Sequence, residues 1–163
     1  MAQAYPAARV SGSDYHEASV EGARERALKA SVTDRVEFEV ASATTFNGTG
    51  FDLVTSFDCL HDMGDPVAAA RHIRSVIAPD GCWMLVEPAA ADDPMDDPTP
   101  VARLYYGFST LLCVPNALSQ GGARVLGAQA GPLAIAGVTR EAGFTRCERV
   151  SGTPFNDVYA VRP

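Results

Sequence analysis

The chain has 163 residues, which is the length of one domain and enough to bury a hydrophobic core. It carries 13 Lys and Arg against 20 Asp and Glu, and the formal net charge of −7 argues against a phosphate-binding surface and hence against a nucleic-acid binder. Hydrophobic residues make up 47% and charged residues 20%, a globular mixture that excludes wholesale disorder.

The cysteines indicate the redox setting. Four of them are spread widely along the chain without any C-x-x-C pair, namely Cys59, Cys82, Cys113 and Cys147. That spacing fits neither a zinc framework nor a dense disulfide scaffold, so we expect no metal site and a reducing, cytoplasmic location. No apolar secretory signal follows Met1.

One uncharged stretch raises the question of a membrane span. Residues 104–123 carry no charge, but Pro115 and the pair Gly121-Gly122 interrupt them. The solid apolar run from Leu104 to Val114 is too short to cross a hydrocarbon core of about 30 Å. We therefore expect no membrane partner.

Strand and helix signals alternate in the first half of the chain. Short β-branched or alternating segments predict strands at Ala8–Ser13, Val36–Val40 and Phe51–Ser56, with Val36–Val40 at a sheet edge. Apolar residues at helical spacing predict a helix over Glu17–Ala30, and a proline at the first position favours a second over Pro66–Ile77.

The second half is less regular. We predict a turn at Ala78–Gly81, a buried strand at Cys82–Val86, a solvated loop at Ala89–Pro100, helices at Val101–Cys113 and Val138–Ala142, and strands at Phe144–Ser151 and Val158–Val161. Strands that alternate with helices specify an α/β fold with a largely parallel sheet.

Ligands of open parallel sheets bind at the carboxyl ends of the strands. The residues predicted there are Asp14-Tyr15, Ser42-Ala43-Thr44, Phe57-Asp58 followed by His61-Asp62, and Glu87-Pro88. An acid directly after a strand can accept two hydrogen bonds from a ribose diol, and a neighbouring aromatic ring can cover an adenine.

An ordered set of motifs along the chain resembles the motifs of the class I S-adenosylmethionine-dependent methyltransferases. The matching pieces run from Tyr5 to Asp14, Arg35 to Phe38, Phe51 to Val54, Leu60 to Asp62, Ala78 to Gly81, Leu85 to Pro88 and Glu141 to Phe144. The resemblance covers nearly the whole chain. It implies a Rossmann-like sheet, mostly parallel with an antiparallel C-terminal strand.

The resemblance also implies where S-adenosylmethionine binds. Asp14 would bind the ribose hydroxyls, Tyr15 would lie near the adenine, and Ser42 and Ala43 would frame the adenine edge, with Phe57 also at the cofactor. The family usually has Asp at the position of Ser42. An alternative for Asp14 is that it only caps the helix predicted to begin at Glu17.

The family's glycine-rich loop, a strand that ends in G-x-G-x-G, is not found in this sequence. The chain thus resembles the C-terminal part of a larger methyltransferase, with the first strand of the sheet lacking. We expect residues 1–163 to form a partial catalytic domain in which 88–137 are an insert that covers the acceptor site. Alone, it is expected to bind S-adenosylmethionine weakly, to transfer no methyl group, and to dimerise or aggregate.

The segment from Leu60 to Asp65 resembles the H-D-x-x-D element of small-molecule O-methyltransferases, in which the histidine is the general base. By this resemblance His61 would take the proton of an acceptor hydroxyl, and Glu87 would orient its ring. Asp62 and the aromatics Tyr105, Tyr106 and Phe108 are the candidates for contact with the small-molecule acceptor. Alternatively, His61 is a structural histidine.

Three other functions compete with methyl transfer to a small molecule. A non-catalytic binding or regulatory module on the same scaffold would tolerate the lack of a glycine-rich loop. A nicotinamide dehydrogenase half-domain explains neither His61-Asp62 nor the C-terminal pair of strands. A nucleic-acid base methyltransferase would carry an Asn/Asp-Pro-Pro-Tyr/Phe motif where this chain has Ser56-Phe57-Asp58-Cys59.

Overall fold

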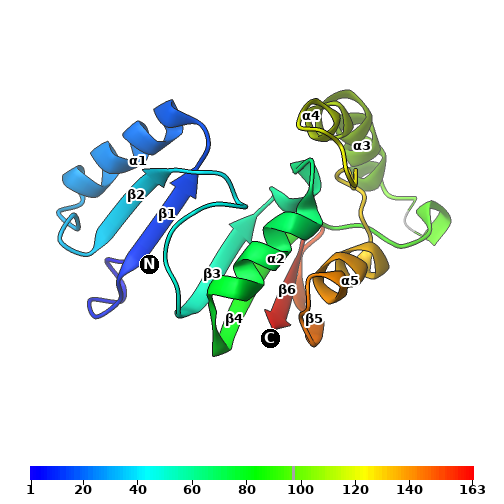
Figure 1. The fold of residues 1–163 in the computed structure, drawn as a ribbon. Helices are drawn as coiled ribbons and strands as arrows, with labels where there is room; N and C mark the ends of the chain where they lie inside the picture. The colour runs from blue at the N-terminus through cyan, green and yellow to red at the C-terminus, as the bar shows by residue number, and fades with distance from the viewer. Residues whose placement is uncertain (97) are drawn as a thin grey trace. The chain divides into compact units, whose positions relative to one another are not determined.

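The computed structural model describes residues 1–96 and 98–163 (Figure 1). The chain forms two compact units, Met1–Asn47 and Gly48–Pro163. The first unit holds two strands and a helix, and the second holds four strands and the remaining helices. Each unit has its own sheet, and we describe the two in turn.

The first unit is a strand–helix–strand unit. The strands β1 (Val10–Asp14) and β2 (Val36–Val40) pair in parallel, and α1 (Glu17–Lys29) connects them. Val20 and Ala27 are buried on α1. At Gly12 a β-carbon would lie 2.7 Å from the Phe38 ring, so this position on β1 must be glycine for the ring to pack across it.

The second unit is built on a four-stranded sheet of order β3-β4-β6-β5. Its strands are β3 (Phe51–Phe57), β4 (Ile77–Pro88), β5 (Arg146–Gly152) and β6 (Asn156–Arg162). β3 and β4 are parallel, whereas β6 runs antiparallel to both of its neighbours. The predicted α/β class and the antiparallel C-terminal strand are confirmed.

Two helices cover this sheet. α2 (Pro66–Val76) and α5 (Pro132–Glu141) contact each other, and α2 lies along the sheet in Figure 1. The carboxylate of Asp65 accepts a hydrogen bond from the Ala68 N–H at 2.8 Å and so caps α2, which begins with the proline expected at its first position. The largest buried apolar side chains are Trp83, Leu60, Leu85 and Ile135.

A further helical stretch lies beyond one end of the strands (Figure 1). It comprises α3 (Pro100–Phe108), a π-helical turn η3 (Ser109–Cys113) and α4 (Val114–Ser119). The prediction that this helix ends at Cys113 was wrong. The helical stretch continues to Ser119, with Pro115 near the start of α4 and directly after the π-helical turn.

Two other predicted boundaries also differ. The turn predicted at Ala78–Gly81 lies within β4, where the pairing with β3 jumps from Ile77 to Cys82 and four residues bulge out of the ladder. A β-carbon on Gly81 would lie 2.7 Å from the Phe51 carbonyl oxygen, so the bulge requires glycine. The last helix begins at Pro132, earlier than the predicted Val138.

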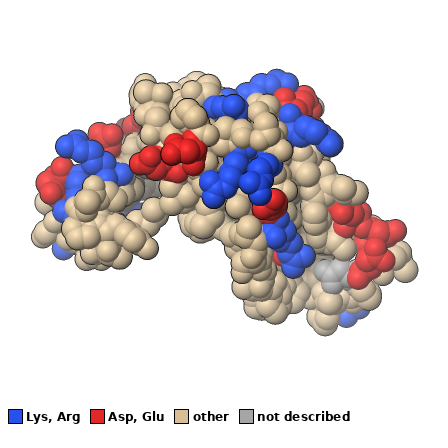
Figure 2. Space-filling model, turned by 90° about the horizontal axis from the view of Figure 1, so that it is seen from below, with Lys and Arg blue, Asp and Glu red and all other residues tan. Residues whose placement is uncertain are grey.

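The short 3₁₀ turns η1 (Leu60–Asp62) and η2 (Pro94–Asp96) complete the secondary structure that the described residues form. Residues 92–96 and 98–100 are exposed, as predicted for a solvated loop. None of the described helices is both long and apolar enough to cross a membrane. Figure 2 shows basic and acidic side chains interspersed over one face of the molecule.

Candidate functional site

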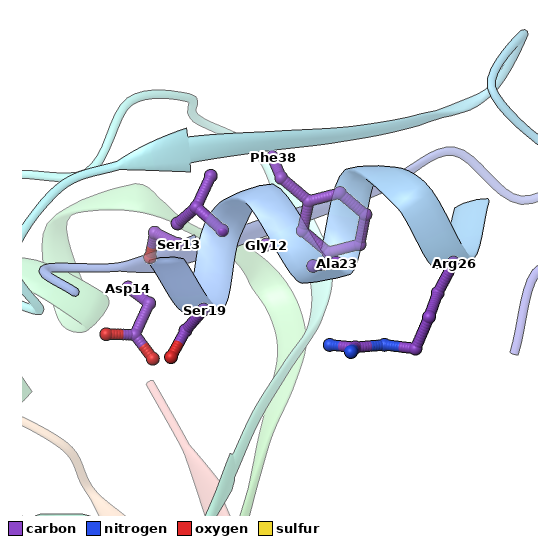
Figure 3. Close-up of a pocket in the computed structure, with 8 residues that line it drawn as sticks. Gly12, Ser13, Asp14, Ser19, Ala23, Arg26 and Phe38 are labelled. Atoms are coloured by element: carbon purple, nitrogen blue, oxygen red, sulfur yellow. The ribbon is translucent and has the colours of Figure 1, made fainter. Parts of the chain in front are cut away.

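The carboxyl end of β1 carries the acid predicted to bind ribose. Asp14 lines a pocket of about 220 Å³ between β1, α1 and β2, together with Ser19 and Arg26 (Figure 3). Asp14 Oδ1 accepts a hydrogen bond from the His16 N–H at 2.8 Å. His16 occupies the N-cap position of α1 without a side-chain capping bond, and Asp14 bonds the N–H of His16 rather than an N–H of the first helical turn, so Asp14 is not the N-cap residue.

The segment after β2 lies beside the end of β1. The Ala41 N–H donates to the Asp14 carbonyl oxygen at 3.0 Å, which places Ser42 and Ala43 next to this strand end. Ser42 Oγ accepts a hydrogen bond from the Thr44 N–H at 3.0 Å, a local turn that a serine forms readily. Tyr15 is 69% exposed and is therefore accessible to a ligand.

These residues of the first unit fit the nucleoside part of a cofactor. The Asp14 carboxylate is at the rim of a pocket and carries oxygens that can accept hydrogen bonds from a diol. The exposed Tyr15 ring offers an apolar face. Ser42 has a hydroxyl in place of the family's carboxylate, so its contact with an adenine amino group would be that of a neutral acceptor.

In the second unit, Glu87 is the buried centre of a hydrogen-bond cluster. It lies near the end of β4 and is 1% exposed. Its Oε1 accepts from the backbone N–H groups of Cys59 and Leu60 at 3.2 and 2.9 Å, and its Oε2 accepts from the His61 N–H at 3.3 Å. The carboxylate thus holds the N-terminal end of η1 in place, because it satisfies amides that the turn leaves unpaired.

The same carboxylate binds the His61 ring. Nδ1 lies 2.5 Å from Glu87 Oε2, and the histidine is 4% exposed. Burial by itself lowers the pKa of His61, but the hydrogen bond and charge of Glu87, with the charges of Asp62 and Asp58, outweigh burial and raise the pKa above its usual 6.5. With Nδ1 engaged, the lone pair available for chemistry is on Nε2.

Asp62 lies on the other side of the ring. Its Oδ1 is 3.3 Å from His61 Nε2, and its backbone carbonyl accepts hydrogen bonds from Asn116 Nδ2 and Gln120 Nε2 at 3.3 and 3.0 Å. The Gly127 N–H donates to the His61 carbonyl oxygen. The helical stretch and the segment after it therefore fix η1 from the side opposite Glu87.

Three neighbours of this cluster, namely Asp58, Cys59 and Asn156, were not assigned a catalytic or binding role from the sequence. Asn156 Nδ2 donates to Asp58 Oδ1 at 2.6 Å, and Asp58 has a left-handed backbone with a φ of 47°. Burial raises the pKa of the Cys59 thiol to about 11, helped by the Glu87 charge, so this thiol stays protonated and unreactive at neutral pH.

The structure does not bring every candidate residue into this cluster. Phe57 is 59% exposed at the end of β3, and Phe108 is 45% exposed on α3. Tyr105 and Tyr106 are half-buried on α3. The candidate residues in direct contact here are His61, Asp62 and Glu87, while Asp14, Tyr15, Ser42 and Ala43 belong to the first unit.

Comparison with known proteins identifies the family. Residues 1–114 match the family model described as a methyltransferase domain, and this match covers more than half of the chain. The chain belongs to this family. It is a class I methyltransferase domain, and the methyl donor of that class is S-adenosylmethionine.

Individual methyltransferases match over part of their length. The 27-O-demethylrifamycin SV methyltransferase of Amycolatopsis mediterranei is 39% identical over 74 residues, which is 44% of this chain and 27% of that protein. Two solved structures, the mitomycin 7-O-methyltransferase MmcR and PigF with SAH, share the fold with TM-scores of 0.73 each. Their sequences are 19% and 17% identical to this chain, respectively. Each match covers 99% of this chain, and it covers 44% of the MmcR chain and 45% of the PigF chain. The chain spans less than half the length of these relatives.

Proposed function

We propose that this methyltransferase domain serves the transfer of a methyl group from S-adenosylmethionine to a hydroxyl oxygen of a small molecule, with His61 as the general base. The observation that carries the proposal is the buried hydrogen bond between His61 Nδ1 and Glu87 Oε2. It leaves Nε2 as the proton acceptor and holds the ring in one orientation. The family membership and the O-methyltransferases among the relatives support the same reaction class.

The chemistry assigned to His61 is proton transfer. A hydroxyl is a weak nucleophile and becomes a strong one as its proton leaves. His61 Nε2 takes that proton while the O–CH₃ bond forms, and the resulting imidazolium is stabilised by Glu87 on one side and by Asp62, 3.3 Å away, on the other. When bound, S-adenosylmethionine would supply the methyl group from its sulfonium: the S–CH₃ bond breaks as the O–CH₃ bond forms, and neutral S-adenosylhomocysteine leaves.

We assign the other residues the roles that the family resemblance implies. Asp14 binds the ribose hydroxyls, Tyr15 covers the adenine, and Ser42 and Ala43 border it, with Phe57 as a further apolar cofactor contact. Asp62 contacts the acceptor hydroxyl, because its carboxylate faces the same ring nitrogen. Tyr105, Tyr106 and Phe108 form the apolar wall for an aromatic acceptor, within a covering insert of residues 88–137.

One sequence feature favours a second function. The printed sequence contains no G-x-G-x-G, the element whose backbone N–H groups receive the methionine part of the cofactor in the family. The alternative is therefore a binding or regulatory module that takes no part in catalysis. Under our proposal the 163 residues alone bind S-adenosylmethionine weakly, and activity requires that this element be supplied.

A chimera tests the proposal. The strand and glycine-rich loop of a family member are fused ahead of Met1, and transfer of radiolabelled methyl from S-adenosylmethionine is measured on hydroxyl- and amine-bearing acceptors, 27-O-demethylrifamycin SV among them. We expect incorporation into a hydroxyl acceptor by the chimera and none by the 163-residue chain. A chimera that binds S-adenosylmethionine but methylates no acceptor would favour the non-catalytic module, and methylation of amines alone would contradict the role of His61.

A further inference from the structure

Three side chains of different chemistry meet beside the His61 ring. A ring nitrogen of His61, a carboxylate oxygen of Asp62 and Cys113 Sγ all lie within 4.8 Å of one another, and His61 Nε2 is 3.3 Å from Asp62 Oδ1. His61 and Asp62 come from η1 and Cys113 from the π-helical turn η3, more than fifty residues later in the chain. His61 and Cys113 are 4% and 8% exposed and Asp62 is half-buried, so two of the three side chains are withdrawn from the surface.

One of these atoms is buried with few partners. Asp62 Oδ1 makes no hydrogen bond of good geometry to the described groups. Its neighbours are the imidazole nitrogen at 3.3 Å and the Cys113 thiol, whose hydrogen bond and charge interaction with Asp62 help to raise the pKa of the thiol. A cation placed between the three atoms would take the place of that thiol proton and satisfy the buried carboxylate oxygen.

Other hydrogen bonds fix the positions of the residues that carry these ligand atoms. Glu87 binds His61 Nδ1 and so directs Nε2 towards Asp62 and Cys113, the carboxylate–histidine arrangement that supports metal ligands. Asn116 and Gln120 bind the Asp62 backbone carbonyl and fix the loop that carries this carboxylate. Binding would therefore require little reordering of the chain.

We propose that His61 Nε2, Asp62 Oδ1 and Cys113 Sγ form a site for a zinc ion. One imidazole, one carboxylate and one thiolate match the nitrogen, oxygen and sulfur ligands of zinc, whereas Mg²⁺ and Ca²⁺ take oxygen ligands only. Three protein ligands leave a fourth position open to water. A bound ion occupies the Nε2 lone pair and so excludes proton acceptance by His61; this consequence, unlike the binding itself, rests on the proposed function.

Titration of the reduced 163-residue chain with Co²⁺ tests the site without any need for activity. Cobalt reports on zinc sites through a thiolate-to-metal absorption band, which Zn²⁺ then abolishes as it displaces the cobalt. We expect one ion per chain with this band, and Cys113→Ser should remove the band and weaken binding by about tenfold or more. Cys82→Ser, which replaces a half-buried cysteine on β4, is the matched control and should leave band and affinity unchanged.

A second variant tests the site in case Cys113→Ser unfolds the chain. Asp62→Asn retains the shape of a partly exposed side chain and removes the ligand charge, so it should weaken Co²⁺ binding while circular dichroism shows an intact fold. Absence of the thiolate band at millimolar Co²⁺ would overturn the proposal. An equal loss in Cys82→Ser, or unchanged binding in folded Asp62→Asn, would do so as well.

Discussion

At the residue scale, the organising side chain of the second unit is Glu87. The sequence suggested that this acid orients His61, but one carboxylate also accepts hydrogen bonds from three successive backbone amides. No sequence pattern predicts such backbone contacts, because they depend on how η1 packs against the end of β4. The proximity of Cys113 to His61 was not predicted for a related reason. Cys113 is far from His61 in sequence, and it lies in an apolar segment that is typical of a hydrophobic core.

Glu87→Gln tests this organising role. The substitution keeps the side-chain size, but it replaces one acceptor oxygen by an NH₂ group that faces N–H donors in a buried site. We expect a loss of about 2–3 kcal/mol in the free energy of unfolding, measured by urea denaturation. Glu141→Gln is the control, because that exposed carboxylate pairs with Arg71 and Arg124 at the surface. Equal losses in both variants would contradict the central position of Glu87.

Asp14→Ala tests the ribose assignment in the chimera that carries the glycine-rich loop. The affinity for S-adenosylmethionine should fall by about 1.5–3 kcal/mol, the scale of hydrogen bonds to a charged group, as read by isothermal titration calorimetry. Glu21→Ala removes the same charge from an exposed position of α1 and should leave the affinity near that of the unmodified chimera. An unchanged affinity in Asp14→Ala would leave only the turn contact with the His16 N–H as the role of Asp14.

At the scale of elements, residue alternation, helical spacing and a first-position proline located the strands and most helix starts. Pro66 marks the start of α2, and alternating residues mark β2. The π-helical turn of η3 could not be predicted, because no local pattern in its apolar sequence marks it; in the structure the Ser109 hydroxyl at its start accepts the Ala128 N–H at 3.1 Å, a contact between segments distant in sequence. The start of α5 was missed although Pro132 has the same first-turn position as Pro66.

The hairpin of β5 and β6 contains a buried charge with a partly exposed partner. Asp157 is 1% exposed and its carboxylate lies 2.9 Å from Arg149 Nε. Burial raises the pKa of Asp157 and the Arg149 charge offsets part of that rise. Stability from this carboxyl is therefore fully present below its unfolded pKa near 3.8 and is lost as the pH rises through the higher folded value.

Arg149→Ala removes the offsetting charge. We expect a loss of about 1–2 kcal/mol at pH 7, where Asp157 is ionised, and a smaller loss near pH 4, both from urea denaturation. Arg146→Ala breaks the exposed pair with Glu148 on the same strand and should change stability little at either pH. A loss in Arg149→Ala that does not depend on pH would show that packing of the arginine stem, rather than its charge, stabilises the hairpin.

At the scale of the whole molecule, the sequence indicated the α/β class and its family, and it predicted a sheet that lacks its first strand. The structure has two sheets, of two and four strands, and among the described residues β1 and β3 each pair with one neighbour only. Periodicity predicts that a strand exists, whereas its partners depend on contacts between segments distant in sequence, which no local pattern encodes.

The free edge of β3 carries exposed apolar side chains. Leu53 is 42% and Phe57 59% exposed, and an unpaired strand edge of this kind favours pairing with another chain. We expect the 163-residue chain to dimerise or aggregate at micromolar concentrations in light scattering, and Leu53→Lys to reduce that association. A monodisperse monomer for the unmodified chain would contradict this expectation.

The methyl-transfer rate of the active chimera, measured with and without His61→Ala, tests whether His61 held by Glu87 is the general base. We expect His61→Ala to lower the single-turnover rate by about 10²–10⁴-fold with little change in the affinity for S-adenosylmethionine. His72→Ala, on α2, is the matched control and should leave the rate unchanged. A fall of less than about tenfold in His61→Ala would contradict the claim and assign the histidine a structural role.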